Sequence, residues 1–500
     1  MVEIQSDDRL TLLAGASGYV GRELLRELQQ RRRPVRCLAR HPERLQAVAA
    51  PGTGLVRGDV LDRSSLDAAF AGVHTACYLV HSMAAGGGFE ERDRQAAVNF
   101  ADAARSAGVS QIVYLGGLGH DPDLSAHLAS RQEVGRLLRA AGVPTVELRA
   151  SIVIGPGSAS FETLRTLVEH VPVIVAPPAL NTLSQPIAIA DVLRYLLAAI
   201  EVHAPADGVF EIGGSDRVSY AELMREYARQ RGLRRSVLTT PLLTPRFSRR
   251  LVATLAPKHG RVAAEMVESL RNQTTVDDGA AAAFGVSAQG LPAAIERALL
   301  DDDRDFADTH WAAAIPTTRR MRWGGLAVGG RRVTSDVIRV EREPEEAFLP
   351  IQRLGGETGW YETDRFWRLR GWLDRAHGGE GMRRGRRDPL DLRVGDAVDF
   401  WRVERIEPAR LLRLTAEMNI PGRLWLQFEV SRERDRTTVR QTTVFDPSGL
   451  TGLAHWYLFY PVHRRVFGRL LDAIAQALAG PARSAWNPPI RSVASGSPSC

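Results

Sequence analysis

The sequence predicts a doubly wound α/β domain over residues 9–300 and a smaller α+β domain over residues 331–480. In the first part, apolar strand-like runs alternate with helical patterns, which is typical of βαβ units and a parallel sheet. From about residue 333 the order changes to one strand, one helix, several strands and a long final helix. A chain of 500 residues is also long enough for two or three domains.

A spaced glycine turn stands near the start of the first domain. The apolar run Leu10 to Ala14 meets Gly15, Gly18 and Gly21, where a helical pattern begins. Such glycines allow a tight turn, a close approach of the backbone to a pyrophosphate, and close packing of helix on strand. The free N–H groups at the start of the helix favour phosphate. The stretch therefore predicts a Rossmann-type dinucleotide site.

The second predicted strand, Val35 to Ala39, ends at Arg40, with His41 and Arg44 nearby. An acidic residue at this position would hold the ribose 2′-hydroxyl of NAD(H). An arginine instead matches the oxygens of a 2′-phosphate with its planar fork. We therefore expect NADP(H) rather than NAD(H). The alternative is that Arg40 only ends a solvated strand.

The remaining elements of the first domain continue the alternation. We expect a helix near Ser64–Phe70, a strand at Thr75–Val80, a helix at Phe89–Ala107, a strand at Gln111–Leu115, a helix near Ser130–Ala141 and a strand at Thr145–Leu148. Ligands of open α/β sheets bind at the carboxyl ends of the strands. His81 follows the fourth strand directly, so we expect it near the reactive end of the cofactor.

The second domain begins after a stretch of different composition. Residues 301–330 hold an acidic run and a glycine-rich segment and predict a linker. The strand candidates are Asp336–Val340, Ala397–Ile406, Leu411–Met418, Leu424–Val430 and Thr437–Phe445, and a helix is expected at Leu453–Leu478. That helix is expected to pack on the strands, and contact with a membrane surface is the less favoured alternative. Residues 481–500 are rich in proline and serine and predict a disordered tail.

The Gly-x-x-Gly-x-x-Gly spacing resembles the short-chain dehydrogenase/reductase superfamily, in its extended and atypical (NmrA-like) branches. Gly58-Asp59-Val60 and Leu148-Arg149-Ala150 also resemble motifs of these branches, and the resemblance covers roughly residues 9–300. It implies that Asp59 meets the adenine ring. The cofactor-binding residues that it implies are Gly15, Ser17, Gly18, Tyr19, Val20, Gly21, Arg40, Asp59, Val60, Leu79 and Val80.

The chain departs from the catalytic pattern of that superfamily. Lys258 is the only lysine, so no Tyr-x-x-x-Lys pair exists, and Gly116-Gly117 stands where a serine would lie. His127 and Arg131 occupy the corresponding helix start. In one interpretation His127 is the acid/base group, Arg131 tunes it or holds the nicotinamide ribose, and His81 is a further catalytic candidate. In the other, the site binds NADP(H) without turnover, as in NmrA-like redox sensors.

The second domain resembles the START-like (helix-grip) fold. Its fusion to an NmrA-like domain resembles a family of bacterial NAD(P)-binding oxidoreductases, and the stretches Tyr78–Met83 and Tyr114–Leu118 look characteristic of it. The resemblance implies a cavity for an apolar small molecule or a lipid-like ligand. The many aromatic residues of this domain suit such a cavity, although an ordinary core explains them as well.

The composition of the chain restricts the class of protein, its possible partners and its location. A hydrophobic fraction of 44% and a charged fraction of 25% are those of a soluble globular protein. The net charge of +7 is spread among acids, so no nucleic-acid partner is expected. Cys37, Cys77 and Cys500 indicate neither disulfides nor a metal site. Without a signal core or an apolar span, the sequence predicts a cytoplasmic protein.

Overall fold

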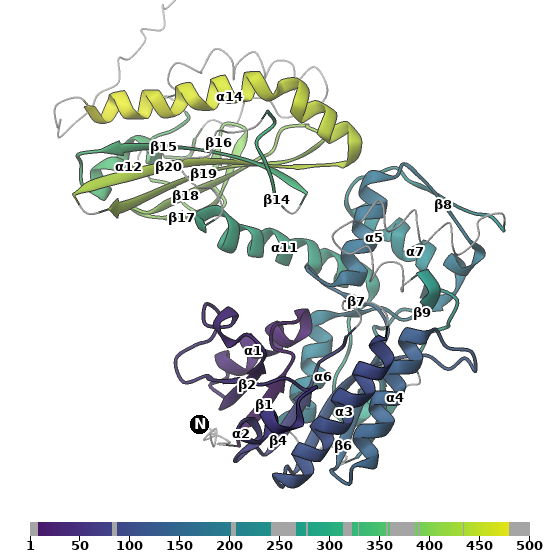
Figure 1. Cartoon of the computed structure of the whole chain (residues 1–500). Coiled ribbons are helices and arrows are strands. Elements are labelled where there is room, and N and C mark those ends of the chain that lie inside the picture. The colour runs from purple at the N-terminus through teal and green to yellow at the C-terminus, as the bar shows by residue number, and fades with distance from the viewer. Residues whose placement is uncertain are drawn as a thin grey trace, which may run out of the picture. The chain divides into compact units, whose positions relative to one another are not determined.

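The computed structural model describes residues 9–82, 88–201, 207–241, 267–276, 279–313, 323–328, 330–356, 359–360, 386–388, 391–433 and 435–479. The chain divides into two compact units, Met1–Phe306 and Ala307–Cys500, shown in Figure 1. Met83, Lys258, Cys500 and the expected tail 481–500 lie outside the described residues.

The first unit contains a seven-stranded parallel sheet in the order β11-β6-β5-β4-β1-β2-β3. The strands are β1 (Thr11–Ala14), β2 (Val35–Ala39), β3 (Gly54–Arg57), β4 (Thr75–Tyr78), β5 (Gln111–Gly117), β6 (Thr145–Ala150) and β11 (Gly208–Ile212). The strand order reverses between β1 and β4. Because such a switch point opens a crevice at the carboxyl ends of the strands, it is where a ligand is expected.

Helices cover both faces of this sheet. Helix α1 (Tyr19–Gln30) packs beside α6 (Ile189–Glu201) and α10 (Gly279–Phe284) on one face. The other face carries α2 (Asp67–Phe70), α3 (Phe89–Ser106) and α4 (Ala126–Ala140). Leu13 points into the first layer, and Leu12 and Ala14 point into the second, as the period of a strand requires. The Rossmann-type parallel sheet expected from the sequence is confirmed.

The rest of the first unit forms a separate core around Phe161, Tyr227 and Ile295. Three two-stranded pairs belong to it: β7 (Val153–Ile154) with β10 (Ile187–Ala188), β8 (Val173–Ala176) with β13 (Ser236–Thr239), and β9 (Leu183–Ser184) with β12 (Val218–Ser219). The helices are α5 (Ala159–His170), α7 (Tyr220–Gln230) and α11 (Leu291–Ala313). Short 3₁₀ turns lie at Pro42–Arg44, Arg63–Leu66 and Pro178–Asn181.

The second unit is an antiparallel sheet with helices packed on it. The strand order is β14 (Leu326–Val328), β15 (Arg331–Val340), β20 (Arg436–Pro447), β19 (Gly422–Glu433), β18 (Leu411–Ala416), β17 (Trp401–Glu407) and β16 (Ala397–Val398). Helix α12 (Pro344–Gln352) and the long helix α14 (Gly449–Ala479) contact each other and the central strands (Figure 1). The core includes Trp360, Trp401 and Trp456, all fully buried.

The expected linker and one expected strand have a different secondary structure from the one that the sequence predicts. Residues 301–313, expected in the linker, continue helix α11, and β14 also lies within the expected linker. The acidic run gains partners that the local sequence does not reveal, since Asp302 pairs with Arg165 at 3.1 Å. The expected strand 397–406 is instead the hairpin β16–β17, in which Val398 pairs with Trp401. Asp399 takes a φ of +57° at this turn, and its carboxylate accepts a 2.7 Å hydrogen bond from Trp360 Nε1.

Candidate functional site

The glycine turn between β1 and α1 is closely packed. Gly15 has a φ of +97°, a value that favours glycine, and the Gly18 N–H donates to the Gly15 carbonyl at 2.9 Å. A Cβ added to Gly21 would lie 2.2 Å from the Gly15 carbonyl oxygen. The first and third glycines are therefore required by the fold itself.

The N-terminus of α1 has the features of an anion site. Its N-cap is Gly18, no side chain caps it, and no acidic residue lies in its first turn. The first N–H groups of an α-helix have no partner within the helix and carry the positive end of its dipole. A pyrophosphate placed against the turn would therefore find donors without displacing a protein carboxylate. These residues fit a dinucleotide cofactor.

A first pocket of about 330 Å³ opens beside this turn. The ends of β1, β2 and β4 and the turn after β3 line it. Eight of the residues expected to bind the cofactor lie on its walls, namely Gly15, Ser17, Gly18, Arg40, Asp59, Val60, Leu79 and Val80. Arg92 of α3 lines it as well and was not expected from the sequence.

Asp59 and Arg40 have different surroundings in this pocket. The Asp59 carboxylate accepts a 3.0 Å hydrogen bond from the Leu61 N–H, so it also shapes its own turn. Arg40 is exposed. The neighbouring acid, Glu43, pairs instead with Arg57 at 3.1 Å and His41 at 3.2 Å. Glu43 therefore has other cationic partners than Arg40, and the exposed guanidinium can reach a ligand in this pocket.

A second pocket of about 400 Å³ shares the lining residues Gly18, Leu79 and His81 with the first. The expected cofactor residues Tyr19, Val20 and Gly21 line this second pocket rather than the first. Among the described residues its wall includes no aspartate or glutamate. Its polar side chains are Tyr19, His81, His127, Arg131, Ser151, Ser158, Ser160, Tyr220, Ser269 and Thr274.

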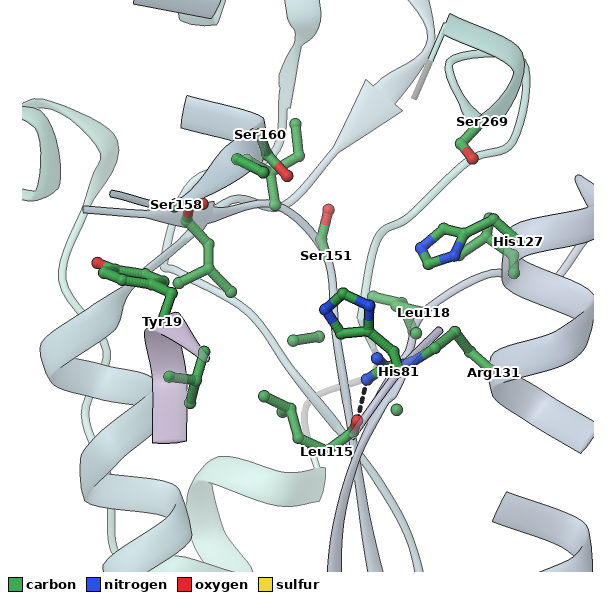
Figure 2. A pocket seen from close by; sticks show the side chains of 18 of the residues that line it. Tyr19, His81, Leu115, Leu118, His127, Arg131, Ser151, Ser158, Ser160 and Ser269 are labelled. Atoms are coloured by element: carbon green, nitrogen blue, oxygen red, sulfur yellow. Dashed lines mark hydrogen bonds between the residues drawn. The ribbon is translucent and has the colours of Figure 1, made fainter. Parts of the chain in front are cut away.

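The three catalytic candidates all line this second pocket (Figure 2). Helix α4 begins at Ala126, earlier than expected, because the Ser125 hydroxyl caps it by accepting from the Leu128 N–H at 3.3 Å. This start places His127 in the first turn and Arg131 one turn later. His81 reaches the pocket from the end of β4. The structure therefore brings together residues separated by 46–50 positions in the chain.

Both histidines are biased toward the neutral form. The surrounding protein atoms, followed by the charge of Arg131, lower the pKa of His81 to about 4, although its ring keeps an open side toward solvent. Burial, then Arg131 and then His81 lower the pKa of the half-buried His127 to about 3. At neutral pH the imidazolium form is therefore disfavoured, more strongly for the half-buried His127 than for the exposed His81.

Arg131 is held in place at the floor of the pocket. Its guanidinium donates to the Leu115 carbonyl, the interaction drawn as a dashed line in Figure 2, and lies 5.5 Å from the centre of the Tyr114 ring. The Tyr114 hydroxyl in turn donates to the Arg131 carbonyl at 2.8 Å. Arg131 therefore supplies a fixed positive charge, whereas a lysine would present a mobile one.

Asp93 is a positioning residue that the sequence reasoning did not identify. It is buried on α3 and accepts from the Ser82 N–H at 2.8 Å and from the Ser130 hydroxyl at 3.2 Å. These two bonds join the segment after β4 to helix α4, and so hold His81 and His127 in their positions relative to each other. An aspartate within an amphipathic helix does not stand out in the sequence, because charged residues are common in such helices.

The hydroxyl groups on the opposite wall were also missed. Ser151 follows β6 and points into the pocket in Figure 2, and its hydroxyl lies 2.7 Å from that of Thr274. Asn272 lies two residues before Thr274 and anchors that segment, because its side-chain oxygen accepts a 3.0 Å hydrogen bond from the Ser125 N–H. The strand-end rule that selected His81 could also have selected Ser151. Thr274 and Ser269 have no sequence signal, because only folding brings them to this wall.

Three further features concern metal binding, membrane-spanning helices and the cysteine residues. Among the residues that the structure describes, no group of three or more His, Cys, Asp and Glu side chains is arranged to hold a metal ion. In the same part of the chain no helix is long and apolar enough to cross a membrane. Cys37 and Cys77 are buried free thiols of the sheet, and burial raises the pKa of each to about 12.

Comparison with family models gives two matches. Residues 15–153 match a family described as NAD(P)H-binding. The first unit carries an NAD(P)H-binding domain. Residues 333–470 match a protein family of unknown function, DUF2867, which covers most of the antiparallel sheet and much of α14. No curated protein matches the chain in sequence at a significant level.

Solved structures similar to the NAD(P)H-binding domain and its surroundings have low sequence identity to the chain. Triphenylmethane reductase of Citrobacter sp., complexed with NADP(H), is 17% identical and has a TM-score of 0.49, with 58% of this chain and 99% of that chain covered. The NADPH-dependent quinone oxidoreductase of Escherichia coli, complexed with NADPH, is 19% identical with a TM-score of 0.47 over 58% and 99%. An Agrobacterium tumefaciens short-chain dehydrogenase/reductase superfamily protein with bound NAD is 16% identical with a TM-score of 0.46 over 60% and 99%.

Proposed function

We propose that this chain is an NADPH-dependent oxidoreductase of the atypical short-chain dehydrogenase/reductase type that reduces a small molecule in the second pocket. The observation that carries the proposal is that Gly18, Leu79 and His81 line both pockets. A dinucleotide that lies along the glycine turn would reach from the first pocket into the second. The second pocket then offers room for a hydride acceptor beside it.

The preference for NADPH rests on Arg40. The guanidinium lies on the wall of the first pocket, while the neighbouring Glu43 is engaged by Arg57 and His41. A charge-assisted, bidentate contact with a 2′-phosphate would favour NADPH over NADH by about 10- to 100-fold. When bound, NADPH supplies the hydride.

The chain's own residues then decide which acceptors are suitable. The lowered pKa values of His81 and His127 favour their neutral forms, which donate or accept a hydrogen bond and are poor sources of an imidazolium proton. Arg131 presents a fixed positive charge toward which negative charge can develop. This combination favours an acceptor whose hydride adduct is a delocalised anion that takes its proton from water. A simple ketone, which needs an acid at its oxygen, is disfavoured.

The second candidate function is a non-catalytic NADP(H)-binding sensor of the NmrA-like type. The specific observation in its favour is that His127, whose pKa is lowered, and Arg131 stand where the superfamily uses a tyrosine and lysine as its proton-transfer pair. In that case the second pocket would hold the nicotinamide without a substrate. The occupancy of the cofactor site would then be the signal.

For residues 331–480 we propose a START-like helix-grip domain that holds an apolar or lipid-like ligand. Support comes from the antiparallel sheet and from α14, which lies against β15 and β20. Trp360, Trp401 and Trp456 are fully buried in its core, so they serve packing first. We also propose a cytoplasmic location, which suits the free thiols of Cys37 and Cys77.

Native mass spectrometry with NADPH and NADH tests the cofactor, and loss of NADPH absorbance with a panel of conjugated acceptors and simple ketones tests turnover. We expect a single NADPH adduct, weaker NADH binding, and turnover only with conjugated acceptors. Arg131→Gln should lower that turnover, while Arg136→Gln, an exposed change on the same helix, should not. Binding of NADPH without turnover of any acceptor would favour the sensor. Absence of any nucleotide adduct would contradict both functions.

A further inference from the structure

Helix α14 uses one face to complete the core of the second unit. Trp456, Tyr460, Phe467, Leu470 and Ile474 of this helix are buried against the sheet. The Trp456 indole also donates to the Gly324 carbonyl at 2.9 Å. This face accounts for the amphipathic pattern expected of a helix that packs on strands.

A second apolar row of α14 faces solvent. Leu450, Ala454, Leu458 and Val462 follow one another at intervals of four residues, which places them along one side of a helix. All four are exposed, and Leu458 is 73% exposed. Phe459, beside them, is exposed as well. Scattered apolar residues on a surface need no explanation, but a continuous row on one helix indicates contact with an apolar phase or partner.

Positive charge continues this row toward the C-terminal half. Arg465 lies three residues after Val462, Arg469 follows four residues later, and Arg464 lies beside them; all three are exposed. The sequence from Gly449 to Leu471 contains no aspartate or glutamate, so the apolar row and the arginines share a segment without negative charge.

The arginines also line a groove of about 480 Å³ together with Trp323, Tyr460, Pro461, Gly468 and Asp472. Trp323 is 65% exposed and meets the edge of the Tyr460 ring, with 5.4 Å between the ring centres. At Gly468 an added Cβ would meet no atom within 4 Å, so this position leaves the groove open. Tryptophan and arginine together are side chains typical of a membrane–water interface.

We propose that the outward face of α14, consisting of Leu450, Leu458, Phe459, Val462, Arg464, Arg465 and Arg469, binds the surface of an anionic phospholipid membrane. The apolar row enters the boundary between headgroups and acyl chains, and the arginines and the groove contact lipid phosphates. Charge complementarity identifies the partner. Three arginines and one carboxylate, that of Asp472, line the groove beside the apolar row, and this net positive face matches a surface that is negative outside and apolar within. The helix lies flat on that surface.

The test is sedimentation of the full chain with vesicles of phosphatidylcholine alone and of phosphatidylcholine with phosphatidylglycerol. We expect binding to the anionic vesicles that weakens as salt is added. Leu458→Asp should lower the partition coefficient by on the order of tenfold. Arg464→Gln, Arg465→Gln and Arg469→Gln should lower it about fivefold each.

Two control variants are matched for exposure and chemistry. Val394→Asp places an acid at a 66% exposed apolar site outside α14, and Arg410→Gln removes an exposed arginine. Neither should change the partition coefficient, and the thermal unfolding of every variant should match that of the wild type. Failure to bind anionic vesicles overturns the proposal, as does equal binding to neutral vesicles without salt dependence. A change of oligomeric mass in Leu458→Asp without any vesicle binding would overturn it in favour of self-association.

Discussion

Replacing Gly21 with alanine tests the cofactor site most directly. The added methyl would lie 2.2 Å from the Gly15 carbonyl oxygen and 2.8 Å from its carbonyl carbon. Ordinary contacts of a Cβ begin near 3.4 Å, so the turn and the first turn of α1 must separate by about 1 Å. Because both groups are backbone, no side chain can rotate to relieve the contact. Overpacking of this kind costs about 1–3 kcal/mol of folding free energy.

The same displacement acts on the ligand. Moving the start of α1 by about 1 Å lengthens the hydrogen bonds that its N–H groups would make to a pyrophosphate. The loss of two charge-assisted bonds at about 1.5 kcal/mol each corresponds to a rise of about a hundredfold in the Kd for NADPH. Isothermal titration calorimetry measures this Kd, and urea unfolding measures the loss of stability.

Gly18→Ala is the matched variant. Its methyl would lie 3.2 Å from the Gly15 oxygen, which requires a shift of only a few tenths of an ångström. We therefore expect a stability change below about 1 kcal/mol. NADPH binding should still be lost, because the second glycine is the point at which the pyrophosphate approaches the backbone. Wild-type NADPH affinity in Gly21→Ala, or an equal loss of stability in both variants, would refute this reasoning.

Three further predictions follow from individual side chains. Arg40→Gln should raise the Kd for NADPH about 10- to 100-fold and leave that for NADH unchanged, as titration calorimetry with each nucleotide will show. Asp93→Ala leaves the buried Ser82 N–H and Ser130 hydroxyl without their acceptor and should cost about 2–4 kcal/mol in urea unfolding. The folded-state pKa of His127, about 3, lies below the ordinary value of 6.5, so the unfolded chain binds more protons and stability falls as the pH drops from about 6.5 toward 3. His127→Gln should remove about 2 kcal/mol of that loss between pH 7 and pH 5, and an unchanged pH profile would contradict it.

The sequence by itself determined the order of the elements and predicted eight of the residues that line the first pocket. Gly15, Gly18 and Gly21 act through backbone geometry that a local pattern encodes, because the turn and its helix lie within a dozen residues. The alternation of strand and helix then gave the parallel sheet, and strand ends in a parallel sheet share one edge. Arg40, Asp59 and His81 could be placed at the pockets for that reason. The long final helix was likewise readable from its apolar period.

Only the tertiary structure decided the electrostatics and the far wall of the second pocket. Asp93 joins Ser82 to Ser130 across three separate segments, and Thr274 reaches Ser151 from 123 residues away. The pKa values of His81 and His127 depend on burial and on a neighbouring arginine in space, which no spacing encodes. Asp399 in the hairpin and Asp302 in helix α11 also contact distant partners, Trp360 and Arg165. Local patterns encode backbone geometry, whereas the charge state of a side chain is set by the groups that folding brings around it.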